Sequence, residues 1–294
     1  MRIVPAPRRR AATALGLLFM PFLLFPSRAD ECHAFAGDPI WDDGKAEFNL
    51  YQAEEPRYGE KRSFEARMIV VKEDLKRDLR VKSDDGPVPG KTVEVLKLNH
   101  VRRVPTGTYD YHQMLSVFLE RASLRPLKLA MSHFESCGIT YVEILPQTDH
   151  LLHTSHSYWD REGDRTVEIP FGPEGLLYDA LPLQLRGMDF EEIRPRKVSV
   201  LPTQISGRVK NLSLVTMTLQ VAGRQKVAVP AGTFDAYRVE LSGPQGKDRY
   251  YFEAALPHRL LRMETAEGSV YRLRKSLRLD YWNHHDNGDD RLLQ

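Results

Sequence analysis

The chain has 294 residues, of which 41% are hydrophobic, and a formal net charge of +2. Residues 1–29 hold five arginines and no acidic residue, so the remainder carries a formal charge of 2 − 5 = −3. No basic stripe interleaved with aromatic residues occurs, which argues against nucleic acid as a partner. The length is sufficient for one sizeable hydrophobic core or two small ones.

The N-terminus has the three parts of a secretory signal peptide. Arginines at 2 and 8–10 precede an apolar run over 11–25, and Ser27 and Ala29 are small residues suited to a cleavage site. The run is shorter than the roughly 20 residues of a membrane-spanning helix. We predict a cleaved signal peptide over residues 1–29, export to the periplasm of a Gram-negative host, and no transmembrane segment after cleavage. An uncleaved membrane anchor is the alternative.

The two cysteines of the chain are Cys32 and Cys137. Export would place them in a compartment where disulfides form. Two cysteines allow one bridge without requiring it. Cys32 and Cys137 are therefore a candidate disulfide, and two separate thiols are the alternative.

Most of the chain after the signal alternates apolar and polar residues, which indicates strands with one face toward a core. Turn sequences such as 84–86 (DDG) and 230–232 (PAG) separate these runs. The alternating sets are Phe64, Ala66, Met68 and Val70; Leu127, Leu129 and Met131; Val215, Met217, Leu219 and Val221; Tyr237, Val239 and Leu241; Tyr271 and Leu273; and Leu277, Leu279 and Tyr281. We predict one antiparallel β domain over residues 30–282 and a flexible polar tail over 283–294.

Two segments have the spacing of short helices. Met114, Leu115 and Phe118 favour a helix over residues 111–122. The second covers residues 173–185, where Pro173 suits a first turn and Pro182 ends or kinks the helix. The predicted fold class is therefore mainly β, a curved antiparallel sheet or half-barrel with one or two short helices.

The common catalytic and cofactor-binding signatures do not occur, and no cofactor or metal is predicted. On a strand, His150 and His156 would share one face and His153 would point to the other, so a metal site would need a third ligand from elsewhere. His133, Glu135 and Cys137 would also share a face. A nucleophile and base four residues apart on one strand are ~13 Å apart, too far for a hydrogen bond.

A group of aromatic residues is the candidate ligand-binding surface. Aromatic side chains that line a concave sheet suit an apolar ligand, and the alternative is that they fill the core. The group is Tyr109, Tyr111, Tyr141, Tyr158 and Trp159.

The C-terminal part, residues 185–281, resembles the DUF3108 family of exported bacterial proteins of unknown function. The resemblance rests on VPAGTFDAYRV at 229–239, YYF at 250–252 and LPHRL at 256–260. RYGE at 57–60 and TGTYDY at 106–111 are similar to motifs of uncharacterised envelope proteins. Such proteins are expected to share the fold of the periplasmic lipoprotein carriers LolA and LolB, in which a curved sheet wraps an apolar cavity closed by short helices. The resemblance supplies no site residues.

These observations predict a non-enzymatic periplasmic or cell-envelope protein that binds or carries an apolar ligand, such as a lipid or a lipoprotein acyl chain. The alternative is a structural or partner-binding envelope protein that uses a sheet edge. A third hypothesis is a hydrolase or metal-dependent enzyme built around His133 or around His150 and His156, and it requires these histidines to converge with a carboxylate in one cleft.

Overall fold

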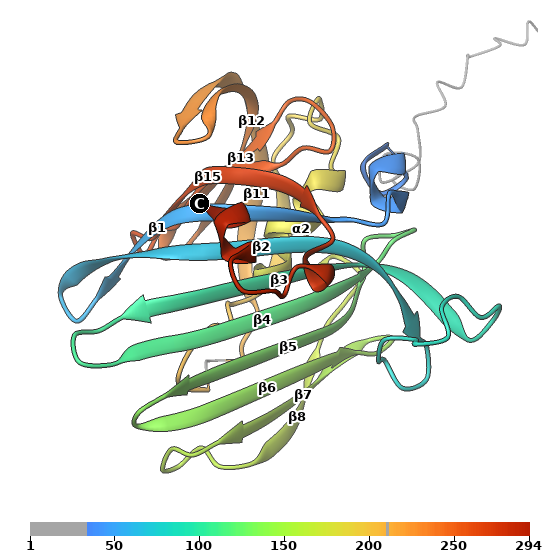
Figure 1. The fold of residues 1–294 in the computed structure, drawn as a ribbon. Coiled ribbons are helices and arrows are strands. Elements are labelled where there is room, and N and C mark those ends of the chain that lie inside the picture. The colour runs from blue at the N-terminus through green and yellow to red at the C-terminus, as the bar shows by residue number, and fades with distance from the viewer. Residues whose placement is uncertain (1–33, 210–211) are drawn as a thin grey trace, which may run out of the picture.

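The computed structural model describes residues 34–209 and 212–294, and the fold is mainly β (Figure 1). Fifteen strands form one continuous sheet. The first eight are β1 (Ala46–Arg57), β2 (Glu60–Lys76), β3 (Thr92–Pro105), β4 (Asp110–Glu120), β5 (Pro126–Glu135), β6 (Gly138–Pro146), β7 (His150–Ser157) and β8 (Arg165–Pro170). The others are β9 (Gly175–Leu177), β10 (Arg196–Leu201), β11 (Val215–Val229), β12 (Gly232–Gly243), β13 (Gly246–Glu253), β14 (Leu260–Glu264) and β15 (Val270–Leu279).

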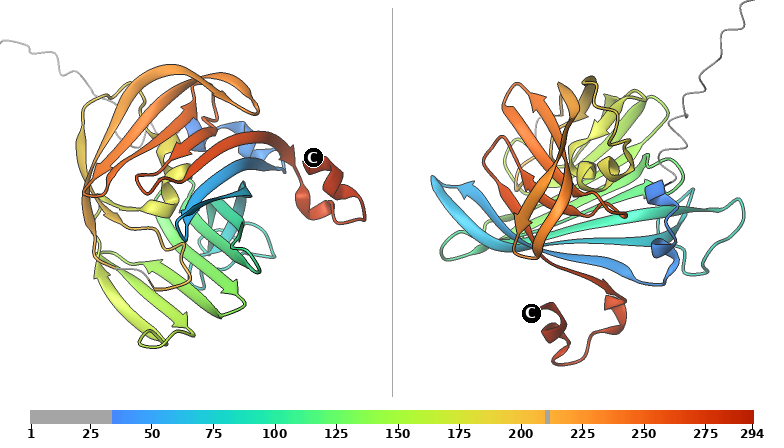
Figure 2. Two further views of the ribbon diagram at one scale, coloured as in Figure 1. Left: turned by 90° about the vertical axis from the view of Figure 1, so that its left-hand side faces the viewer. Right: turned by 90° about the horizontal axis from the view of Figure 1, so that it is seen from above.

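The sheet consists of two antiparallel meanders. One runs through β1–β8 and the other through β10–β15, and they join where β1 pairs with β15. The short strand β9 pairs with β10 in parallel, and β8 and β9 are the two edges. The sheet curls into an open half-barrel (Figure 2). The prediction of a mainly β fold built on one large sheet is therefore confirmed.

The first predicted helix, over residues 111–122, is wrong, because this segment forms strand β4. Leu115 and Val117 are buried on the inner face, whereas Met114 is 47% exposed on the outer face. This segment fits both a helical spacing and a period of two. The strand pairs with β3 on one side and β5 on the other, and its period of two buries every second residue from Tyr111 to Leu119, which a helix could not do.

The second predicted helix, over residues 173–185, is found in part. Its beginning forms β9, and three short helical turns follow: η2 (Tyr178–Ala180), α2 (Leu181–Gln184) and η3 (Leu185–Gly187). Pro182 lies in the first turn of α2 rather than at its end, where a missing N–H costs no helical hydrogen bond. Leu181, Leu183 and Leu185 belong to the main core, so the helical segment fills the inside of the half-barrel (Figure 2).

A buried ion pair fixes this helical segment to the sheet. Both guanidinium Nη atoms of Arg186 donate to the Glu47 carboxylate of β1, at 2.9 and 2.7 Å. The Arg186 guanidinium also donates to the Pro257 carbonyl and lies over the rings of Phe35 and Trp41. Because each charge is fully partnered, the cost of burying the pair is offset by its hydrogen bonds. The pair therefore fixes which side of the helical segment faces β1.

The C-terminal residues lie against the outer face of the sheet. They form two turns of 3-10 helix, η4 (Tyr281–Asn283) and η5 (Asp289–Leu293). Tyr281 and Leu293 pack on an outer cluster that contains Phe48 and Ile69. The Lys275 ammonium donates to the carbonyls of residues 292 and 294. Residues 283–294, expected to form a flexible tail, therefore have defined contacts, because β1 and β2 carry apolar side chains on both faces.

The predicted signal peptide, residues 1–29, lies outside the described residues. Across 34–209 and 212–294, every helix is too short or too polar to cross a bilayer.

Candidate functional site

A cavity of about 510 Å³ lies at one end of the half-barrel. Its walls come from η2 and from strands of both meanders, including β1, β3, β11, β13 and β15. Its rim includes the turns at 244–246 and 265–269. The volume falls in the roughly 300–1,000 Å³ range of small-molecule sites. The cavity is therefore the candidate functional site.

The floor of the cavity carries a buried polar network centred on Arg102 of β3. Arg102 donates to the Glu55 carboxylate and, through Nη1, to the Tyr271 hydroxyl at 2.7 Å. The second Glu55 oxygen accepts from Arg57 at 3.0 Å. Glu55 therefore accepts hydrogen bonds from two guanidinium groups. His100, two residues before Arg102 on the same face, remains neutral because burial, together with Arg102, lowers its pKa to about 3.

Asp179 of η2 anchors the segment that follows β10. Its two carboxylate oxygens accept from the Thr203 hydroxyl at 2.6 Å and from the Gln204 backbone N–H at 2.7 Å. Further along, the Thr140 hydroxyl donates to the Gly207 carbonyl at 2.8 Å. We call residues 202–207 the strap, because hydrogen bonds hold them across the inner face of the sheet. The strap forms one side of the cavity.

Another wall of the cavity is formed by Asp248 and Tyr250 of β13 and by Tyr178. Asp248 is 4% exposed and accepts from the Ala266 backbone N–H at 2.6 Å. Burial raises the pKa of the Asp248 carboxyl, and the Ala266 N–H and the Tyr178 hydroxyl only partly offset this effect. The Tyr250 hydroxyl is buried beside the Tyr178 hydroxyl, which interacts with it. This wall is therefore polar, and the partners of its carboxylate are neutral.

The remaining wall is apolar. It is lined by Pro56, Pro182, Val200, Pro202, Ile205, Val215, Met217 and Met263. A cavity with apolar walls and a few convergent polar groups suits a ligand that has both kinds of surface.

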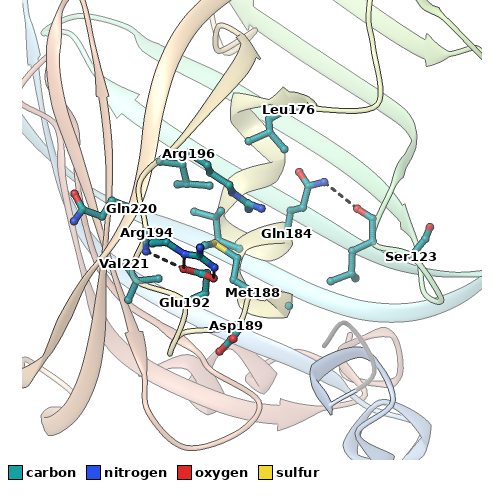
Figure 3. A pocket seen from close by; sticks show the side chains of 14 residues that line it. Ser123, Leu176, Gln184, Met188, Asp189, Glu192, Arg194, Arg196, Gln220 and Val221 are labelled. Atoms are coloured by element: carbon teal, nitrogen blue, oxygen red, sulfur yellow. Dashed lines mark hydrogen bonds and ion pairs between the residues drawn. The ribbon is translucent and has the colours of Figure 1, made fainter. Parts of the chain in front are cut away.

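A smaller hollow of about 120 Å³ lies between the β4–β5 turn and β11 (Figure 3). Gln184 points across it and donates to the Leu124 carbonyl at 3.1 Å. The exposed Glu192 and Arg194 pair with each other at its rim. Its volume is below that of ordinary ligand sites, so we do not assign it a ligand.

The aromatic residues singled out from the sequence do not line the cavity. Tyr111 is buried beside His133, and Tyr109 packs on Tyr111 edge to face. Tyr141 stacks on the exposed His156. Tyr158 and Trp159 follow β7; Tyr158 is 76% exposed, and Trp159 lies under the Arg208 guanidinium at 4.0 Å. The five residues therefore lie at one end of β4–β7, outside the 510 Å³ cavity, and their role as a ligand-binding surface stays a prediction.

The histidines also lie apart. His153 is buried and its Nε2 lies 3.2 Å from the Gln204 Oε1, whereas His150 is partly exposed and His156 is exposed, as the strand pattern predicts. His133 is fully buried, with its Nε2 3.6 Å from the Glu135 carboxylate. Within residues 34–209 and 212–294, no three His, Cys, Asp or Glu side chains are grouped to hold a metal ion.

Cys137 lies in the turn between β5 and β6 and is exposed. Cys32 lies outside the described residues. The Cys32–Cys137 disulfide therefore stays a prediction.

Sequence reasoning missed the residues that line the cavity. The sequence feature that could have identified them is a charged residue at a core position of an alternating strand. In β3, Leu96, Leu98 and Val104 are buried on the face that also holds Arg102. Asp248 occupies the same kind of position two residues before Tyr250. A charge at a core position of a strand needs either a partner or a function.

Comparison of the chain with protein-family models, with curated proteins and with solved structures found no match. The resemblance to the DUF3108 family and to LolA and LolB therefore stays a prediction from the sequence.

Proposed function

We propose that this is a non-enzymatic binding or carrier protein of the bacterial cell envelope, exported to the periplasm, and that it holds a small amphiphilic ligand in the 510 Å³ cavity. The cavity is the observation that carries the proposal. The helical segment fills much of the half-barrel, so the ligand is small, and only part of a long acyl chain would fit. The apolar wall around Val215 and Met217 suits a hydrocarbon, and the polar groups of the cavity lining suit a head group.

The test combines two measurements, the mass of any ligand that co-purifies with the protein and the fluorescence of a dye that binds to it. Native mass spectrometry of protein purified from the envelope without detergent is expected to show a bound amphiphile. The neutral dye N-phenyl-1-naphthylamine is expected to fluoresce on binding. Val215→Trp places an indole in the cavity and is expected to lower dye affinity about tenfold, the scale of losing the burial of a few methylene groups.

Thr216→Trp is the matched control, because Thr216 is the next residue of β11 and points to the exposed face. It is expected to bind dye as the unsubstituted protein does. A clean apo mass without dye uptake, or equal dye affinity in the Val215→Trp variant, would overturn the proposal.

A further inference from the structure

The charges that line the cavity do not cancel. Arg57 and Arg102 supply two positive charges, and His100 is neutral at pH 7. Four acidic residues face them, namely Glu55, Asp179, Asp248 and Glu267. The formal charge of the lining is therefore 2 − 4 = −2. A lining of this sign raises the local concentration of cations and disfavours anions.

The two arginines are already compensated. Both donate to Glu55, and Asp179 also favours the charged form of Arg102. An anionic ligand would have to compete with these buried carboxylates. Each arginine therefore already has a carboxylate partner in Glu55, although the Nε of each has no hydrogen-bond partner among the described residues.

Asp248 differs from Glu47 and Glu55, the two buried carboxylates that pair with arginines. Glu47 pairs with Arg186, and Glu55 with Arg57 and Arg102. Asp248 is equally buried, yet within the described residues it forms no ion pair. The donors that reach it, the Ala266 N–H and the Tyr178 hydroxyl, are neutral. A buried carboxylate without a cation is costly, and a bound cation would remove that cost.

The basic neighbours of Asp248 in the chain do not supply this cation. Lys247 lies on the outer face and donates to Glu240 at 2.5 Å. Arg249, also on the outer face, donates to Glu264 at 3.4 Å. Because side chains alternate along β13, both point away from the cavity. The inner side of Asp248 therefore faces Tyr178, Tyr250 and the cavity.

We propose that the ligand of this cavity carries a cationic nitrogen and that the Asp248 carboxylate binds it. This inference rests on the proposed function. The hydroxyls of Tyr178 and Tyr250 supply further polar contacts beside the carboxylate. Glu267, exposed at the rim, attracts the same charge toward the entrance. The ligand class is an amphiphile with an ammonium head.

The experiment compares four compounds built on an eight-carbon chain: octylamine, octyltrimethylammonium, octanol and octanoate. Isothermal titration calorimetry at pH 7 is expected to show one or both ammonium compounds binding about tenfold more tightly than octanol. This is the scale of one hydrogen bond to a charged group for octylamine, and of a close contact between opposite charges for octyltrimethylammonium. Octanoate is expected to bind most weakly. Octylamine and octyltrimethylammonium distinguish a primary from a quaternary nitrogen.

Asp248→Asn keeps the shape and the Ala266 contact while removing the charge, so it is expected to cancel the preference for the ammonium compounds over octanol. Asp235→Asn removes the same charge from the exposed face of β12 and is expected to change nothing. Glu267→Gln, at the exposed rim, is expected to give a smaller loss without disturbing the core.

The outcomes separate the two proposals. Equal binding of all four compounds, tightest binding of octanoate, or an equal loss for all four in Asp248→Asn would overturn the cationic site while leaving a ligand cavity. Failure of all four to bind would overturn the proposed function and this inference together.

Discussion

His100 lies on the inner face of β3, where its ring packs against Tyr271 at 5.6 Å and its Nε2 is buried without a partner among the described residues. Burial, with Arg102 nearby, lowers its pKa from 6.5 to about 3. Above pH 6.5 the imidazole is neutral in both the folded and the unfolded chain. Below that pH the unfolded chain takes up a proton that the folded chain does not, so stability is lost as pH falls from 6.5 toward 3.

His100→Leu is expected to reduce this loss. Replacing an unpartnered polar group by an apolar one of similar size is expected to change the free energy of unfolding at pH 7 by less than about 1.5 kcal/mol. Between pH 6.5 and 4, the free energy of unfolding of the variant is expected to fall less steeply than that of the unsubstituted protein. The two slopes are expected to differ by up to about 1.4 kcal/mol per pH unit. Urea unfolding across this range measures the difference.

His285→Leu is the control for this measurement, because His285 is exposed. It is expected to keep the slope of the unsubstituted protein. A slope in His100→Leu equal to that of the unsubstituted protein would show that His100 already takes up its proton in the folded state.

At the scale of the elements, β4 shows what an alternating sequence determines and what it leaves open. Helical spacing groups Met114 and Leu115 on one buried face, whereas a strand places them on opposite faces. The structure buries Leu115 and leaves Met114 47% exposed. The choice between helix and strand depends on pairing with β3 and β5, and these two segments must themselves be identified as strands first. Local spacing therefore could not decide it.

This distinction can be measured by two alanine substitutions. Leu115→Ala is expected to lower the free energy of unfolding by about 2–5 kcal/mol, since it leaves a cavity in the core. Met114→Ala is expected to change it by less than about 1 kcal/mol. Urea unfolding of both variants checks the difference, and similar losses at both positions would contradict the strand.

The cavity was harder to predict than the fold, for a related reason. Mainly β structure and one large sheet follow from alternation, which is local. The cavity joins Glu55, Arg102, Asp248 and Tyr271, which lie on four strands and meet only because β1 and β15 close the two meanders side by side. No spacing in the sequence encodes that pairing. A charged residue at a core position predicts that a partner or site exists, but not which strand supplies the other side.

For the whole molecule, the curl of the sheet creates two different surfaces. The inner face is filled by the core and the helical segment, apart from the cavity at one end. The outer face of β1 and β2 carries Phe48, Ile69 and Val71, a patch that the C-terminal residues cover. Leu293 packs on this patch, whereas its neighbour Leu292 is 40% exposed. The C-terminal segment thus protects the centre of the sheet, where the two meanders join.

Leu293→Asp is therefore expected to detach the C-terminal segment, because a carboxylate cannot remain against Phe48 and Ile69 without a partner. Amide hydrogen exchange of residues 281–294, followed by mass spectrometry, is expected to be about tenfold faster than in the unsubstituted protein, which corresponds to about 1.4 kcal/mol of lost docking. Leu292→Asp carries the same new charge at an exposed position and is expected to leave this exchange rate unchanged. Equal exchange in the two variants would show that the outer patch does not hold the segment. Faster exchange in Leu293→Asp alone would show that the contact of Leu293 with the outer patch holds the segment on the sheet.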